Sequence, residues 1–430
     1  MKHTKKVTIK RKPLSRDAQF KILCLFPAYF TLIGLFSQPL SDISRGLYTI
    51  VTEPDFLITD YVELGGIGAA LINAGLLTFV CIGIIYFLKM EITGATITSL
   101  FLMLGFSLFG KNIINIWAIL LGIFVYAKYH KEHLSKYIYV GFYGTSLSPI
   151  ITQVIQSSGS SIAVSLVISV LVGVAIGFVL PPLSTHVFSI HKGYCLYNVG
   201  FSAGIIAIVI VSIFKSFGYT IGSRFIWSSG NNEFFMYVLI SFFIIIMVIG
   251  MIIEPDFFEK YKDILKHQGV CGTDYIIEEG LGATLFNMGI NGILCTLYVV
   301  AVGSELNGPT MGGIFTVVGF SATGKHLGNI VPVMLGVYLA SYLKVWNLTD
   351  PSAILAALFA TTHAPIAGRF GFFAGILAGF IHSSVALSIG IVYDGMNLYN
   401  NGFAGGIVAA FLVPVILSIE DRKARAKGIA

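Results

Sequence analysis

Two short stretches of the sequence carry residues that could bind a phosphate group. Residues 319–325 read GFSATGK and residues 105–111 read GFSLFGK, and both fit the G-x-x-x-x-G-K pattern of a nucleotide-binding loop. That loop continues with a Ser or Thr for magnesium, whereas His326 and Asn112 follow here. It also needs a preceding strand, but GFSATGK follows the apolar stretch MGGIFTVV. These departures exclude ATP hydrolysis, so the two stretches need another explanation.

Glycines and a lysine ahead of a helix can still hold an anion. Lys111 and Lys325 end the two stretches, which also contain Ser107 and Ser321, and we expect a new helix to begin directly after each lysine. Free N–H groups at a helix N-terminus, with a cation beside them, form an anion site. The alternative is a lysine at a helix end that extends its ammonium group to the membrane surface. All four residues are candidate substrate-binding residues.

Other ionisable side chains also lie in apolar segments, where each costs roughly 2.5–3.5 kcal/mol and therefore indicates function. His363 and Arg369 flank Pro and Gly in ATTHAPIAGRFG and are candidate substrate-binding residues; a surface anchor is the alternative for Arg369. His382 is a candidate proton relay, or else an interhelical hydrogen bond. Asp274 precedes an apolar segment and is a candidate coupling residue, or else a helix cap.

Asn73 and Asn287 occupy matching places in two Gly-rich apolar segments. Amides there suit close helix packing and also suit the binding of a neutral solute, and both interpretations stay open. The sequence contains no HExxH motif and no plausible GxSxG triad, so we expect no enzyme. Its five cysteines lack ligand spacing, so we expect no metal, cofactor or disulfide framework.

The composition indicates the surroundings in which these residues work. Hydrophobic residues make up 56% of the 430 residues, charged residues only 11%, and the mean hydropathy is +0.85. Soluble proteins carry roughly 25% charged residues. Continuous apolar runs of membrane-spanning length occur at 20–37, 67–88, 160–180, 199–214, 234–253, 281–302, 371–392 and 403–418. The fold class is therefore an all-α polytopic membrane protein.

The chain is an internal duplication. Residues 59–126 align without a gap with residues 273–340, and 23 of the 68 positions are identical. The match continues at shifted offsets, where GYCLYNVGFSAGI (193–205) corresponds to GMNLYNNGFAGGI (395–407), and YGTSLSPII (143–151) to FATTHAPIA (359–367). We divide the chain into a basic tail (1–17), repeat 1 (18–230), repeat 2 (231–419) and a second basic tail (420–430).

Each repeat is expected to hold about five long helices, in repeat 1 at 20–37, 67–88, 112–129, 160–180 and 199–214. Two shorter segments, 94–110 and 137–157, contain Gly, Pro, Ser and Thr and are expected to be broken or re-entrant. Interrupted segments at matching positions in two halves are the best sequence indication of a transporter's binding site.

The distribution of basic residues favours inverted repeats over parallel ones. Lys and Arg concentrate in cytoplasmic loops. Residues 41–62 contain one basic residue where the matching loop of repeat 2 has three, and the loop after the GK helix shows the reverse bias. The basic tails, MKHTKKVTIKRKPLSR and EDRKARAKG, place both termini in the cytoplasm, and we expect the bacterial inner membrane as the location.

The duplicated TDY…GxGAxLxNxG and GFSxxGK blocks, with the LYNxGFxxGI ends, resemble a family of bacterial integral membrane proteins of unknown function over nearly the whole chain. That resemblance implies no activity. A fainter similarity links MGINGIL (288–294) to the Gly-Asn-Gly stretches of urea transporters, whose Leu-Pro…Thr…Pro-Phe pore motif is missing here.

The sequence thus predicts a transporter for a small, anionic solute, such as a carboxylate or a phosphorylated compound, with its pathway between the repeats. A channel for a small neutral solute such as urea and an intramembrane enzyme are the alternatives. The expected partners are the solute and the lipid bilayer, with homo-oligomerisation left open; a nucleic-acid partner is not expected.

Overall fold

The computed structural model describes residues 14–157, 161–219, 221–222 and 224–426. In this part of the chain nine helical segments are long and apolar enough to cross a membrane, which confirms the prediction of a polytopic helical membrane protein. They are α1 (Arg16–Ser37), α4 (Ile67–Phe87), α9 (Ile162–His191), α10 (Asn198–Ser216), α11 (Asn232–Ile253), α14 (Leu281–Ala301), the segment Pro351–Phe370, α19 (Phe372–Ile389) and α20 (Asn400–Ala426).

Shorter elements complete each repeat. Four are short apolar helices: α5 (Gly94–Phe106), α6 (Trp117–Tyr129), α15 (Gly308–Phe320) and α16 (Leu327–Ser341). The rest of repeat 1 comprises α2 (Leu40–Thr52), α3 (Tyr61–Gly65), η1 (Leu134–Lys136), α7 (Ile138–Gly144), η2 (Thr145–Leu147) and α8 (Ser148–Ser157). The rest of repeat 2 comprises α12 (Phe257–Ile264), α13 (Tyr275–Glu278), α17 (Pro351–Phe359), η3 (Ala360–His363), α18 (Ala364–Phe370) and η4 (Gly390–Tyr393). The predicted tails fall partly on residues 1–13 and 427–430, outside the described residues.

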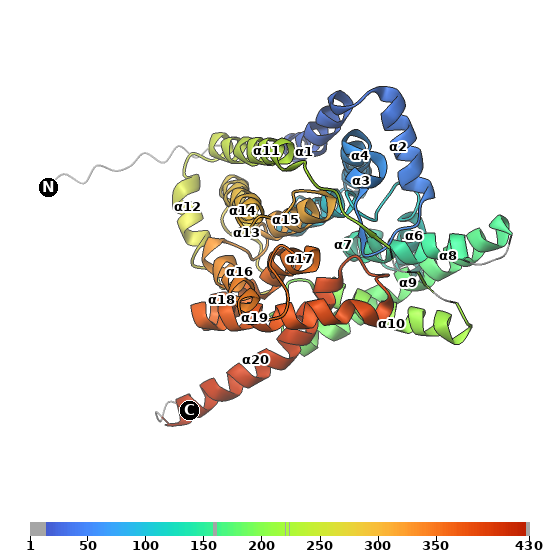
Figure 1. The fold of residues 1–430 in the computed structure, drawn as a ribbon. Coiled ribbons are helices and arrows are strands. Elements are labelled where there is room, and N and C mark those ends of the chain that lie inside the picture. The colour runs from blue at the N-terminus through green and yellow to red at the C-terminus, as the bar shows by residue number, and fades with distance from the viewer. Residues whose placement is uncertain (1–13, 158–160, 220, 223, 427–430) are drawn as a thin grey trace.

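The two halves repeat the same order of elements. In Figure 1 repeat 1 runs from blue to green and lies mainly to the right, and repeat 2 runs from yellow to red and lies mainly to the left. Within each half the first helix packs on the second long one, as α1 does on α4 and α11 on α14. In the same way α6 packs on α9, and α16 on α19. The duplication seen in the sequence is thus also a duplication of packing.

Glycines at matching positions allow these helix pairs to approach closely. A Cβ atom added to Gly177 of α9 would lie 2.1 Å from the carbonyl oxygen of Ile119 in α6. Its counterpart Gly379 of α19 would place a Cβ atom 2.0 Å from the carbonyl oxygen of Val333 in α16. Small residues at such contacts are typical of helix packing in lipid, because packing and not hydrophobicity holds the helices together.

The short helices α5 and α15 lie against each other at the centre of the bundle and run antiparallel. Gly94 at the start of α5 approaches Ala322 beyond the end of α15, and Gly308 at the start of α15 approaches Leu108 beyond the end of α5. Every residue of α15 is buried, so its uniformly apolar sequence fits a position away from lipid. At 1.5 Å per residue a 13-residue helix is about 20 Å long, too short to cross a hydrocarbon core of about 30 Å.

Two acids join the repeats by capping these helices reciprocally. Asp60 of repeat 1 accepts a hydrogen bond from the backbone N–H of Gly308 at 3.1 Å. Asp274, its counterpart in repeat 2, accepts one from the N–H of Gly94 at 2.8 Å. Each acid also caps the short helix that follows it, α3 or α13. The helix starts are therefore held by the opposite repeat.

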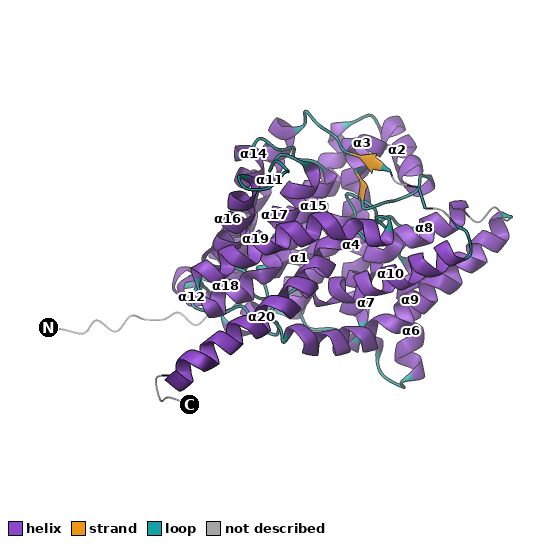
Figure 2. Cartoon of the chain, turned by 60° about the horizontal axis from the view of Figure 1, so that its bottom comes forward, coloured by secondary structure: helices purple, strands orange, loops and turns teal. Residues whose placement is uncertain are grey.

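Three details differ from the sequence-based expectation. The helix predicted over 112–129 begins at Trp117, because the side chains of Asn112 and Asn115 bind the backbone of the preceding turn. The helix predicted over 160–180 extends to His191 and includes Pro181 and Pro182. Two strands, β1 (Ile58–Thr59) and β2 (Phe225–Ile226), form a minimal parallel ladder, which Figure 2 shows beside α2 and α3.

Candidate functional site

The break after α5 and the break after α15 are fixed by the same asparagine clamp. The side-chain amide of Asn73 donates to the carbonyl oxygens of Ser107 at 2.7 Å and of Lys111 at 2.9 Å. Asn287 donates to Ser321 and Lys325, both at 2.8 Å. Buried carbonyl groups that leave a helix need such partners, so each clamp holds one break in place. The two asparagines therefore support the backbone at the lysines.

The backbone N–H groups next to the lysines are already bonded. Lys111 donates its N–H to the carbonyl of Phe106, and the N–H of Asn112 bonds the side chain of Asn115 at 3.0 Å. In repeat 2 the N–H of His326 bonds the side chain of Asn329 at 2.9 Å. The N–H groups that directly adjoin the lysines are thus taken by a carbonyl oxygen and by asparagine oxygens, and are not free for an anion. The lysine side chains are the remaining charged groups of the breaks.

Both lysine side chains are wholly buried, and each contacts neutral groups. The Nζ atom of Lys111 donates to the carbonyl oxygen of Phe142 at 3.1 Å and lies 3.6 Å from the sulfur of Met103. The Nζ atom of Lys325 donates to the hydroxyls of Tyr197 at 2.5 Å and of Thr361 at 2.8 Å. Neither lysine forms an ion pair with a carboxylate in the described part of the chain.

An aromatic bridge, which we define as Phe106, Tyr399, Tyr197 and Phe320, connects the two lysines. Adjacent ring centroids lie 5.2, 4.9 and 4.8 Å apart in that order. Lys111 lies over Phe106 at 4.9 Å, and Lys325 lies over Tyr197 at 4.5 Å, distances at which a ring face attracts a cation.

Each repeat supplies half of the bridge, since Phe106 corresponds to Phe320 and Tyr197 to Tyr399. The bridge is not fully symmetric. The hydroxyl of Tyr197 accepts from Lys325, but that of Tyr399 is buried and has no hydrogen-bond partner among the described residues.

The other predicted residues take different places. The Ser107 hydroxyl donates to the carbonyl of Met103, and the Ser321 hydroxyl donates to that of Val317. Both hydroxyls therefore bond the preceding helical turn. Arg369 lies at the surface, 3.7 Å from Glu420, and does not join the lysines. This position agrees with the anchor interpretation, because a charge at a helix end remains hydrated there.

Asp274 is half-buried beside α5, and burial raises the pKa of its carboxyl against the opposing hydrogen bonds from Gly94, Ile277 and Ile276. The residue acts as the cap described above, as the alternative interpretation of the sequence holds. It lies outside the aromatic bridge, which is made of other elements.

The structure brings His363 and His382 together, although they lie 19 residues apart. Nε2 of His363 is 3.1 Å from Nδ1 of His382, and Nε2 of His382 is 3.1 Å from Oδ1 of Asn401. Both rings are completely buried. His363 comes two residues after Thr361, which bonds Lys325, so the histidine pair adjoins one end of the aromatic bridge.

One polar residue of this region was not singled out from the sequence. Asp55 is buried, accepts from the hydroxyl of Tyr61 at 2.7 Å and accepts from the side chain of Asn115 at 3.0 Å. Burial raises the pKa of its carboxyl to about 7, against the opposing effect of these bonds. The repeated EPDF motif contains it, but its counterpart Asp256 is exposed, so the motif alone did not indicate a buried acid.

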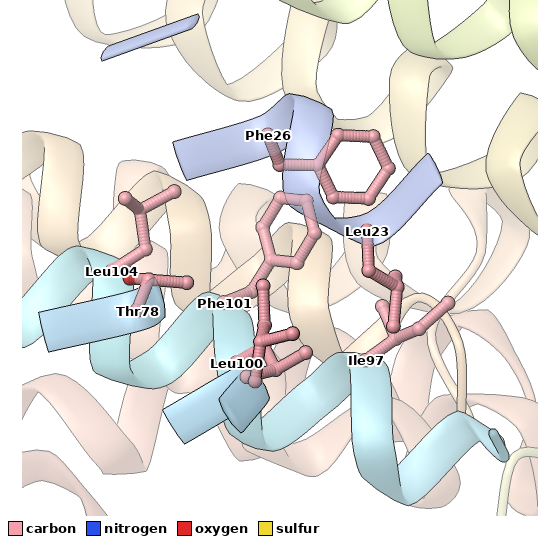
Figure 3. A pocket seen from close by; sticks show the side chains of 8 residues that line it. Leu23, Phe26, Thr78, Ile97, Leu100, Phe101 and Leu104 are labelled. Carbon is pink, nitrogen blue, oxygen red and sulfur yellow. The ribbon is translucent and has the colours of Figure 1, made fainter. Parts of the chain in front are cut away.

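A small apolar void lies on the side of α5 that packs on α1 and α4. Figure 3 shows its lining of leucine, isoleucine and phenylalanine side chains, with Thr78 as the one hydroxyl residue. That hydroxyl donates to the carbonyl of Ala74, so it offers little to a polar ligand. The void holds about 10 Å³, which is at most one water molecule. It is therefore a packing defect and adds nothing to the lysine region.

Comparison with protein families gives a match. The model of the family described as "Protein of unknown function (DUF1576)" matches residues 40–216 and 253–418, more than half of the chain. The two matched segments coincide with the two repeats. Neither the curated proteins nor the solved structures include a match to the chain.

Proposed function

The chain belongs to the DUF1576 family of proteins of unknown function, and we propose that it is a membrane transporter for a small anionic solute. The solute crosses at the interface of two inverted repeats, near the aromatic bridge. The observation that carries the proposal is the pair of buried lysines, Lys111 and Lys325, which occupy matching helix breaks and contact neutral groups.

The inverted arrangement is supported by the course of the central helices. An axis along the membrane normal would give matching transmembrane helices the same direction, whereas an axis in the membrane plane reverses them. The helices α5 and α15 match in sequence and run antiparallel, with each start beside the other's end. The exchange of basic residues between matching loops supports the same arrangement, with both termini in the cytoplasm of a bacterial cell.

The anionic substrate follows from the charge of the site. An ammonium group buried without a counter-charge costs several kcal/mol, roughly, after relaxation of its surroundings. A carboxylate or phosphate between the lysines would remove this cost and would accept the hydrogen bonds that neutral groups now receive. The ring faces beside each ammonium would contact the apolar part of the solute. An anion therefore gains more from this site than a neutral molecule does.

The asparagine clamps favour an anion over the neutral-solute alternative. A urea-like pore would need free amide donors along its wall, whereas Asn73 and Asn287 each donate both side-chain N–H groups to backbone carbonyls. Because the clamps occur identically in both repeats, they serve to shape the breaks. The lysines are then the groups available to a solute.

The proposal is tested by ligand-dependent thermal unfolding of the purified protein in detergent. The anions are inorganic phosphate, succinate and 3-phosphoglycerate, and the neutral compounds are urea and glycerol. A ligand that binds the folded state raises the melting temperature. We expect at least one anion to stabilise the wild type and the control Lys344→Met, in which the exchanged lysine is peripheral and bonds Ser383 and Ser384.

The double variant Lys111→Met/Lys325→Met should lose that response while it still unfolds cooperatively. Stabilisation of the wild type by the neutral compounds alone would overturn the proposal. An anion response of equal size in the double variant would overturn the assignment to the lysines.

A further inference from the structure

The chain of hydrogen bonds from His363 through His382 to Asn401 has a direction. The side-chain oxygen of Asn401 can only accept, so Nε2 of His382 carries the hydrogen. Nδ1 of His382 is then the bare nitrogen and accepts from Nε2–H of His363. Nδ1 of His363 is left as a bare lone pair. It is buried and has no hydrogen-bond partner within the described residues.

Repeat 1 shows that this position does not need polar residues in order to pack. His363, His382 and Asn401 correspond to Leu147, Leu180 and Val199, which are buried in one apolar cluster. The surrounding glycine contacts are the same in both repeats, as Gly177 and Gly379 illustrate. All three polar residues are thus confined to repeat 2, where they cost desolvation that the apolar set avoids.

His363 lies near the lysine end of the bridge, two residues after the Thr361 that bonds Lys325. The titratable groups within electrostatic range of His363, besides its partner, are His191 of α9 and Lys325. Lys344 at the end of α16 bonds the Phe380 carbonyl and Ser383 of α19. A proton at His363 would therefore lie near Lys325, which the proposed function makes a binding group for the anion.

We propose that His363 and His382 form a proton-binding site, entered at Nδ1 of His363, through which the transporter takes up one proton with its anion. This coupling rests on the proposed function, whereas the proton site itself rests on the geometry of the pair. The ligand class is a hydrated proton delivered from the substrate pathway.

One proton moves through the histidine pair in two steps. A hydrated proton passes its proton to the lone pair of Nδ1 of His363 and leaves a neutral water molecule. The proton on Nε2 of His363 then moves across the 3.1 Å hydrogen bond to Nδ1 of His382. His382 becomes an imidazolium whose Nε2–H stays on Asn401, and His363 becomes neutral with its hydrogen on Nδ1. Because the Asn401 oxygen cannot accept a proton at the end of the chain, the pair holds one proton and releases it again at Nδ1 of His363.

The first experiment is nitrogen-15 NMR of the wild type labelled at histidine, in lipid bilayers, with His363→Leu for assignment. At about pH 8 we expect the Nδ1 of His363 to be unprotonated and its Nε2 to be protonated. On acidification that Nδ1 should gain a proton. Nδ1 of His363 already protonated at the higher pH, or unchanged throughout the acidification, would overturn the proton site.

The second experiment measures proton entry into vesicles loaded with a pH-sensitive dye, under an imposed pH gradient. The compared proteins are the wild type and His363→Leu/His382→Leu/Asn401→Val, which carries the residue set of repeat 1 and should fold for that reason. Each is measured without an anion and with inorganic phosphate, succinate or 3-phosphoglycerate. We expect proton entry by the wild type to exceed that by the variant, with the variant at the rate of protein-free vesicles. Equal rates of the two proteins under all conditions, or entry by the wild type that no anion increases, would overturn the coupling.

The two proposals fail in different ways. A variant that loses proton entry but keeps its thermal response to an anion supports both the coupling and the lysine site. The other outcome is that the variant loses proton entry while the melting temperature of the wild type responds to none of the anions. That outcome supports the proton site and contradicts the anionic substrate class. The triple variant thus tests proton binding independently of anion binding.

Discussion

The carboxylate of Asp274 accepts a hydrogen bond from the backbone N–H of Gly94, which lies 180 residues earlier in the chain. Asp60 and Gly308 make the matching contact from the other repeat, so each acid connects the two halves. The two caps differ in their surroundings. Asp60 is fully buried and also binds Ser228, near the end of repeat 1, whereas Asp274 is partly exposed. One end of the α5–α15 pair is therefore closed more firmly than the other.

This difference predicts unequal effects of Asp60→Asn and Asp274→Asn. Asp60 uses one oxygen for Val62 and Gly308 and the other for Ser228, so an amide loses one whole set of bonds. Asp274 receives its bonds from Gly94 and from α13 largely through one oxygen, which asparagine retains. We expect Asp60→Asn to destabilise by about 1–3 kcal/mol and Asp274→Asn by less than about 1 kcal/mol. Denaturant unfolding in detergent measures both, and equal losses would contradict the assigned asymmetry.

A stability gain is expected from Lys111→Met. The exchange removes a buried, uncompensated ammonium, and the Phe142 carbonyl that it releases still accepts from the hydroxyl of Thr145 at 2.7 Å. Replacing buried charges by apolar side chains of similar volume often stabilises by about 1–4 kcal/mol. Lys325→Met should gain less, since it takes a donor from the hydroxyls of Tyr197 and Thr361. Thermal unfolding checks the order, and strong destabilisation by Lys111→Met would show that its charge is compensated.

Much of the fold could be predicted from the sequence, because the signals for spans and for duplication are spread over many residues. The 23 identities between residues 59–126 and 273–340 fix which elements correspond. The breaks after α5 and α15 were indicated by their glycines. The sequence did not indicate which side chains bind the backbone carbonyls at those breaks. Asn73, for example, lies 34 and 38 residues from the carbonyls that it binds.

The functional residues were predicted less evenly. The lysines and both histidines were identified by their cost in an apolar segment, a property of each residue alone. The contact between His363 and His382 depends on how α19 packs on η3, which no local pattern specifies. A sequence signal did exist, since both histidines replace leucines of repeat 1. Arg369, a candidate substrate-binding residue with a surface anchor as the alternative, lies at the surface. The sequence does not separate these two interpretations, because a terminal charge and a buried one look alike in it.

We expect the buried carboxyl of Asp55 to make the stability of the folded protein depend on pH. Its pKa in the folded protein is raised to about 7 from an ordinary value of 3.8, so between these values the folded state holds a proton that the unfolded state releases. The contribution of protonated Asp55 to the stability of the folded state is fully present below about pH 4 and is lost as the pH rises through about 7. Asp55→Asn, which cannot ionise, should therefore gain relative to the wild type with rising pH, by roughly 4 kcal/mol at most.

The pH series needs a control of opposite sign. The exposed Asp263 bonds Lys266 at 2.6 Å, and this bond lowers the pKa of its carboxyl. Asp263→Asn should lose stability relative to the wild type as the pH rises through the usual carboxyl range. Unfolding midpoints of the three proteins from acid to neutral pH provide the comparison. A flat difference between the wild type and Asp55→Asn would show that Asp55 ionises normally.

The close helix crossings predict severe and equal effects of Gly177→Ala and Gly379→Ala. A methyl group at either position would lie within about 2 Å of a backbone carbonyl oxygen, that of Ile119 or that of Val333. Because backbone cannot move aside as a side chain can, α9 must separate from α6, or α19 from α16. Overpacking of this kind costs typically 1–3 kcal/mol and here should reach at least about the upper value.

The matched control is Gly83→Ala in α4, whose added methyl group meets no atom within 4 Å. It should be neutral or stabilise by up to about 1 kcal/mol, since alanine favours the helix. Melting temperatures in detergent distinguish the three variants, and tolerance of alanine at Gly177 or Gly379 would refute the close approach.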